Sequence, residues 1–130
     1  MKCHQPQLTN LEQRLLFGIS EEEGLRRFFW MWTLKEAYTK ALGMGLGFDF
    51  SRVEFDVPEG MVRVDGEVPR GWRFHKFIVN QGEDVYQGVV AEYVGEDEKT
   101  MVISEFEAHP WLHIMEAASF IDRAVQELTC

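Results

Sequence analysis

The chain has 130 residues, a formal net charge of −9 at pH 7 and 45% hydrophobic residues. This length predicts a single domain, residues 1–130, and no apolar run reaches the roughly 18 residues that cross a membrane as a helix. The acidic charge disfavours nucleic acid as a partner, because a phosphate backbone would be repelled. Cys3 and Cys130 form no disulfide framework and residues 1–8 hold no apolar signal stretch, so we expect a cytoplasmic protein with no membrane partner.

A capping signal near the N-terminus predicts a short helix. Thr9 and Glu12 have the spacing of a capping box, in which each side chain bonds the other residue's backbone. We therefore expect a helix over about residues 10–17, with Gly18 as its stop.

A second, longer helix is expected over residues 21–42. Ser20 is a favourable cap, three glutamates follow it where the helix dipole favours negative charge, and Gly43 provides the end. At about 100° per residue, one face of this helix is apolar and should pack on the core. That stripe consists of Met31, Leu34, Tyr38, Ala41 and Leu42.

The other side of the long helix carries one aromatic residue followed by polar and charged side chains. It contains Phe29, Thr33, Glu36 and Lys40. Lys35 is expected at the edge of the apolar stripe, away from Glu36 and Lys40, where its aliphatic stem could cover the core and its amino group reach solvent.

Alternating apolar residues predict strands in the second half of the chain. The expected strands cover residues 53–57, 62–64, 72–79 and 85–93. The last two should form an antiparallel hairpin around a loop at 80–84. Residues 100–106 are expected to be extended, and residues 111–128 to form an amphipathic helix after Pro110. This order predicts an α+β fold with the long helix packed on a small, mainly antiparallel sheet.

Glu36 and Lys40 lie one helical turn apart, a spacing with two interpretations. A carboxylate there could bind a hard metal ion such as Mg²⁺, and the lysine could meet a phosphate of the same ligand. A glutamate and a lysine at this spacing are also the commonest surface pair on helices, worth only about 0.3–0.5 kcal/mol. Spacing alone therefore does not decide between a site and a solvated face.

The residues around this pair form a more specific pattern. Trp32-Thr33-Leu34-Lys35-Glu36-Ala37-Tyr38-Thr39-Lys40 resembles the W-[ST]-x-K-E-[AS]-x-x-K signature of the 4′-phosphopantetheinyl transferase superfamily. Gly43-Met44-Gly45-Leu46 is similar to the G-x-G-L that follows this helix in the surfactin-synthetase-activating type. Phe48 to Phe55 resembles the aminoadipate-semialdehyde dehydrogenase-activating enzymes. The similarity covers residues 8–94 and leaves 95–130 as a C-terminal extension with the amphipathic helix.

The resemblance implies the C-terminal half of a pseudo-dimeric transferase fold. Such enzymes move 4′-phosphopantetheine from coenzyme A to a serine of a carrier-protein domain, with Mg²⁺ on the pyrophosphate. By this resemblance Glu36 is a metal ligand and catalytic, and Lys40 is catalytic and contacts a coenzyme A phosphate. Lys35 matches the first lysine of the signature and is a further candidate for binding coenzyme A.

The sequence departs from the family pattern in its acidic residues. Complete relatives of this type carry an essential metal-binding aspartate in a G-[IV]-D-x-E motif of the first half. That motif is absent here, and residues 1–28 contain no aspartate. We therefore expect an incomplete metal site, in a fragment or in a half that needs an N-terminal half or self-association. A silent fragment that binds coenzyme A or a carrier protein, and an interaction module with a chance match, remain open alternatives.

Overall fold

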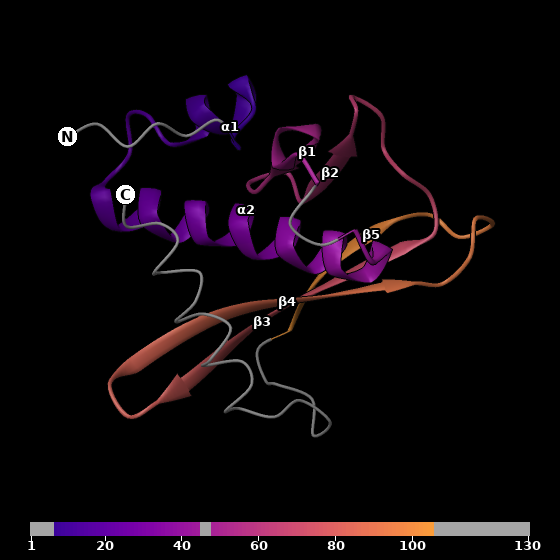
Figure 1. The fold of residues 1–130 in the computed structure, drawn as a ribbon. Helices are drawn as coiled ribbons and strands as arrows, with labels where there is room; N and C mark the ends of the chain where they lie inside the picture. The colour runs from indigo at the N-terminus through magenta and orange to yellow at the C-terminus, as the bar shows by residue number, and fades with distance from the viewer. Residues whose placement is uncertain (1–6, 45–47, 106–130) are drawn as a thin grey trace.

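The structure, a computed structural model, describes residues 7–44 and 48–105. Two helices precede a small hairpin and a three-stranded sheet, so the expected α+β class is confirmed (Figure 1). The elements are α1 (Asn10–Leu15), α2 (Glu21–Leu42), β1 (Val53–Asp56), β2 (Met61–Val64), β3 (Trp72–Gln81), β4 (Asp84–Tyr93) and β5 (Met101–Glu105). The helix expected over residues 111–128 lies outside the described residues.

Both helices begin where their capping signals place them. The Thr9 backbone N–H donates to a Glu12 carboxylate oxygen at 2.9 Å, and the Thr9 hydroxyl accepts from the Glu12 N–H at 3.3 Å, which completes the capping box. Ser20 accepts from the third residue of α2 at 3.2 Å. Gly43 has a φ of 72°, which glycine tolerates better than other residues, and it ends α2 at the predicted position. The first helix ends at Leu15, earlier than expected.

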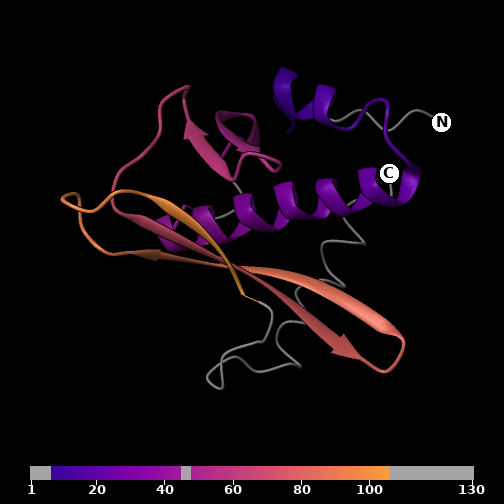
Figure 2. The same cartoon turned by 180° about the vertical axis from the view of Figure 1, so that it is seen from behind.

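Helix α2 lies between two layers. The three-stranded sheet covers one side, and α1 with the β1–β2 hairpin covers the other (Figures 1 and 2). Burial follows these two layers rather than the single predicted stripe. Met31, Leu34 and Tyr38 are buried as predicted, whereas Thr33, on the face expected to be polar, is only 1% exposed. The last two members of the predicted stripe, Ala41 and Leu42, are exposed.

The larger sheet has the strand order β4-β3-β5. Strands β3 and β4 pair antiparallel through Gln81 and Asp84, so the connecting loop is the two residues Gly82 and Glu83 and not the expected 80–84. Gly82 has a φ of 62°, as two-residue hairpin turns require at their first central position. Strand β5 pairs parallel with β3, and β1 pairs antiparallel with β2. The sheet structure is thus mainly antiparallel, as predicted, with one parallel pair.

The core fills the space around α2. Its buried residues are Leu8, Trp30, Met31, Leu34, Tyr38, Phe48, Val53, Phe55, Val62, Trp72, Phe74 and Val89. A smaller cluster around Phe77 and Val79 includes Tyr86 and Val90 at its margin. Within the described ranges, no helix is both long enough and apolar enough to cross a membrane.

Candidate functional site

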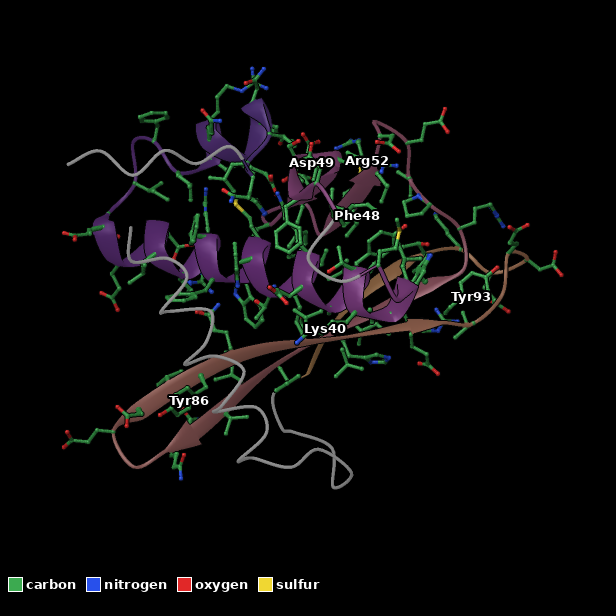
Figure 3. The ribbon with its side chains drawn as sticks, in the orientation of Figure 1. Lys40, Phe48, Asp49, Arg52, Tyr86 and Tyr93 are labelled. Atoms are coloured by element: carbon green, nitrogen blue, oxygen red, sulfur yellow. The ribbon has the colours of Figure 1, made fainter. Side chains whose placement is uncertain are left out.

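Glu36 and Lys40 lie one turn apart on α2. A Glu36 carboxylate oxygen is 3.8 Å from the Lys40 ammonium nitrogen, and the two side chains are 16% and 51% exposed. Lys40 projects from the helix on the side of the three-stranded sheet in the view of Figure 3. An exposed ammonium beside a carboxylate provides one group for a phosphate and one for a cation or a proton.

Trp32 lies on α2 one turn before Glu36. Its ring meets Phe50 edge to face, with the centroids 5.3 Å apart. Phe50 belongs to a short 3-10 turn, Phe50–Arg52, so Trp32 fastens the helix to this turn and not to the larger sheet. The Trp32 indole nitrogen is buried without a hydrogen-bond partner in the described part of the chain.

Lys35 does not lie at a solvent-exposed edge, and the expectation that its amino group reaches solvent is wrong. Its side chain is 1% exposed, and its ammonium lies 2.6 Å from a carboxylate oxygen of Glu12, which is itself 0% exposed. The same ammonium donates to the Gln7 carbonyl at 2.6 Å. Burial lowers the pKa of Lys35 from its ordinary value, and the Glu12 carboxylate opposes that shift. The physical reason is that α1 covers this side of α2 and supplies a carboxylate.

Sequence reasoning missed this partner of Lys35. The capping box explained Glu12 at the sequence level, so its second contact went unnoticed. The contact spans 23 positions, and no local pattern in the sequence signals it.

The segment after α2 is built for packing. Phe48 is buried, and the Arg52 guanidinium lies 4.8 Å from the centre of its ring. Arg52 also forms two hydrogen bonds with Asp65, at 2.9 and 2.8 Å. Asp49 accepts from the Ser51 N–H and hydroxyl at 3.0 and 2.7 Å. Residues 48–55, which resemble the family in sequence, therefore have a structural role in supporting α2.

A magnesium site would need more ligands than these residues supply. Glu36 offers carboxylate oxygens, the kind of ligand Mg²⁺ prefers. Across residues 7–44 and 48–105, however, no three side chains of His, Cys, Asp or Glu cluster closely enough to hold a metal ion. Glu36 is therefore a suitable type of ligand for Mg²⁺, but the described residues supply too few ligands to hold the ion.

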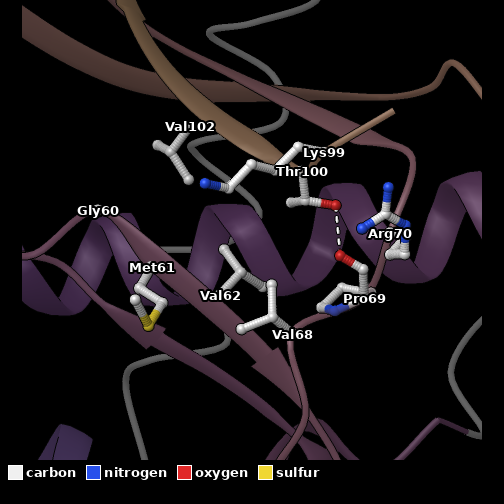
Figure 4. A pocket seen from close by; sticks show the side chains of 9 residues that line it. All are labelled: Gly60, Met61, Val62, Val68, Pro69, Arg70, Lys99, Thr100 and Val102. Atoms are coloured by element: carbon white, nitrogen blue, oxygen red, sulfur yellow. Dashed lines mark hydrogen bonds between the residues drawn. The ribbon is translucent and has the colours of Figure 1, made fainter. Parts of the chain in front are cut away.

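An apolar cavity of about 520 Å³ lies elsewhere. It opens between β2, the segment 68–70 and the start of β5, and the hydroxyl of Thr100 donates a hydrogen bond to the Pro69 carbonyl in its lining (Figure 4). None of Trp32, Glu36 and Lys40 lines it. The candidate site is thus the surface of α2 and not this cavity.

Comparison with known proteins decides the family. A sequence model described as the 4′-phosphopantetheinyl transferase superfamily matches residues 3–94. The chain belongs to this superfamily. Its fold of long helix, hairpin and small sheet is that of one half of a phosphopantetheinyl transferase.

Individual relatives agree with this assignment. A 4′-phosphopantetheinyl transferase of Paxillus involutus is 50% identical over 123 residues, which is 94% of this chain and 46% of that protein. The L-aminoadipate-semialdehyde dehydrogenase-phosphopantetheinyl transferases of Rattus norvegicus and Homo sapiens are 34% and 32% identical over 85 residues, which is 56% of this chain and 28% of each relative. The chain therefore spans less than half the length of these curated relatives.

The comparisons also bear on residues 95–130 of this chain. The family match stops at residue 94, but the match to the Paxillus protein is long enough to include most of residues 95–130. Strand β5, which starts at Met101, pairs with β3. The first part of the extension is thus a strand of the same sheet.

Proposed function

We propose that this chain supplies the C-terminal half of a transferase that moves 4′-phosphopantetheine from coenzyme A to a serine of a carrier-protein domain. The observation that carries the proposal is the placement of Glu36 and Lys40, the last two charged residues of the signature, 3.8 Å apart on one surface of α2. The printed names of the relatives, phosphopantetheinyl transferase in each case quoted above, support the same activity.

In this proposal the two side chains have separate tasks. Lys40, about half exposed, binds a phosphate of coenzyme A and holds the pyrophosphate in place. Glu36 would be a ligand of Mg²⁺, which when bound neutralises charge on the pyrophosphate. The serine oxygen forms a bond to the β-phosphorus while the bond to the leaving 3′,5′-ADP breaks. The Glu36 carboxylate is placed to take up the serine proton, directly or through a water.

The remaining ligands must come from outside the described residues. Because the chain spans 46% of the Paxillus protein, we propose that an N-terminal half, or a second copy of this chain, completes the site. Oxygen atoms of the coenzyme A phosphates would provide further ligands, as is usual for Mg²⁺ bound with a phosphorylated substrate.

The test is phosphopantetheine transfer with the chain assembled with an N-terminal half from a relative. Glu36→Gln should lower kcat by at least about 100-fold, the usual cost of losing an acid–base or charge-stabilising group. Glu22→Gln, at an exposed position in the first turn of the same helix, is the matched control and should leave the rate unchanged. Full activity in Glu36→Gln would remove Glu36 from the mechanism.

A second candidate is a catalytically silent chain that binds coenzyme A or a carrier protein. The lack of a three-ligand cluster among the described residues favours it. Isothermal titration of the chain with coenzyme A separates the two functions. Binding in the absence of any transfer, even with an added N-terminal half, would support the silent chain.

A further inference from the structure

We propose that Glu12 and Lys35 are a positioning pair, whose buried contact sets the rotation of α2 and with it the direction of Glu36 and Lys40. Lys35, in this inference, does not touch coenzyme A. The inference rests on the proposed function of the α2 surface, and it assigns a role to a pair that the proposed reaction leaves unused.

The pair joins three elements at one buried point. One Glu12 oxygen accepts from the Lys35 ammonium at 2.6 Å and from the Thr9 N–H at 2.9 Å. The other accepts from the backbone N–H of Phe55, in β1, at 2.9 Å. The Gln7 carbonyl accepts a further hydrogen bond from Lys35. Glu12 therefore connects α1, α2 and β1 through directional contacts.

A helix fixed at Lys35 is also fixed at the next residue. Successive side chains on an α-helix differ by about 100° in direction, so any rotation of α2 that moves Lys35 moves Glu36 by the same angle. A buried charged pair with several hydrogen bonds fixes one geometry, whereas apolar side chains of similar volume can pack in several. We infer that this specificity is the function of the charges.

The contacts also exclude Lys35 from the ligand surface. To reach a phosphate, its ammonium would have to leave both Glu12 and the Gln7 carbonyl. That movement would leave a carboxylate that is 0% exposed without its cation, which is strongly unfavourable. Lys40, 51% exposed, needs no such movement.

The inference is tested with Lys35→Met, Glu12→Gln and the double variant in the assembled enzyme. Each single variant should lower kcat by about 10- to 100-fold, the cost of misplacing reacting groups, with KM for coenzyme A within about twofold of the wild type. The double variant should lose no more than the worse single variant, because the two residues act as a unit. Glu23→Gln, which breaks the exposed 2.7 Å pair with Arg26 on the same helix, is the control and should not change kcat.

Two kinetic results with these three variants would overturn the inference. One is a rise of tenfold or more in KM for coenzyme A in Lys35→Met but not in Glu12→Gln, which would make Lys35 a direct contact. The other is a loss in the double variant equal to the product of the single losses. If the single variants do not fold, Glu12→Asp is tested in their place, because aspartate keeps the negative charge on a shorter side chain. It should fold with lowered kcat, and a wild-type kcat would contradict the inference.

A readout without activity separates this inference from the proposed function. If the assembled wild type transfers no phosphopantetheine, the proposed function fails. Amide hydrogen exchange then tests the role of Glu12 and Lys35 independently of activity. The Phe55 amide should exchange slowly in the wild type and faster in both Glu12→Gln and Lys35→Met. An unchanged exchange rate of the Phe55 amide in Lys35→Met would show that Glu12 holds β1 without Lys35. That result would overturn the proposed role of the pair.

Discussion

Tyr38 shows at the scale of one residue how α2 is fastened to the sheet. Its side chain is 7% exposed, and its ring lies 4.9 Å from the centre of Trp72 on β3. Phe48 and Phe74 complete the surroundings, at centroid distances of 6.3 and 6.2 Å. Because Tyr38 belongs to the signature helix, this aromatic cluster keeps the helix that carries Glu36 against the core.

Tyr38→Ala should therefore destabilise the chain by about 3 kcal/mol, the lower end of the cost of truncating a large buried aromatic residue. Urea unfolding followed by tryptophan fluorescence measures the change. Phe17→Ala, at a side chain that is 77% exposed, serves as the control and should change the unfolding midpoint little. Equal midpoints for Tyr38→Ala and the wild type would show that the cluster contributes no stability.

The pair of Arg52 and Asp65 predicts a dependence of stability on pH. The hydrogen bond from Arg52 holds the pKa of Asp65 below its ordinary value of 3.8. A carboxyl with a lower pKa in the folded state adds stability above the unfolded pKa, and that stability is lost as pH falls through the folded pKa. Asp65 has a φ of 53°, which asparagine also tolerates. Asp65→Asn should thus melt below the wild type at pH 6 and together with it near pH 2. Parallel melting curves across this range would exclude the pair as a source of acid sensitivity.

At the scale of elements, the β3–β4 hairpin depends on one glycine. Gly88 lies opposite Phe77 across the two strands, and a Cβ at Gly88 would overlap the Phe77 ring. The ring fills the space that a side chain at position 88 would occupy. The hairpin in turn forms the surface on which α2 packs, since β4 makes the main contact with that helix.

Gly88→Ala should cost roughly 1–3 kcal/mol, because the added methyl forces the Phe77 ring from its position. The free energy of unfolding in urea measures this cost. Phe77→Leu in the Gly88→Ala background should recover part of it, since the smaller side chain removes the overlap. A loss in the double variant as large as the sum of both single losses would show that the two positions do not interact.

Elements with local signals could be predicted from the sequence, and long-range contacts could not. The bounds of α2 follow from Ser20 and Gly43, and the hairpin strands follow from alternation. The contact between Lys35 and Glu12 spans 23 positions and joins two residues that each had a sufficient local explanation. The parallel pairing of β5 likewise depends on how the chain after β4 crosses the start of β3, which no local pattern encodes.

For the candidate site the same division holds. The residues Glu36 and Lys40 were predicted from the signature, and the structure places them on one surface. Their metal-binding and phosphate-binding roles stay predictions. Lys35 is a candidate for binding coenzyme A only through its match to the first lysine of the signature, and a motif match does not distinguish a buried side chain from an exposed one.

At the scale of the whole molecule, the chain has the fold of one half of a larger enzyme. It spans 46% of its Paxillus relative, and its described residues hold no group of three side chains that could bind a metal ion. In the proposed function, the surface of α2 that carries Glu36 and Lys40 faces the partner half across bound coenzyme A. In the proposed function, catalysis requires a partner for this half, either an N-terminal half or a second copy of this chain.

The most direct measurement is the mass of an apo carrier protein after incubation with coenzyme A, Mg²⁺ and either this chain, an N-terminal half from a relative, or both. We predict a mass gain of one phosphopantetheine group with both halves, and none with the N-terminal half alone or with Glu36→Gln in the mixture. An unmodified carrier protein in the complete mixture, with both halves shown to be folded and associated, would contradict the claim.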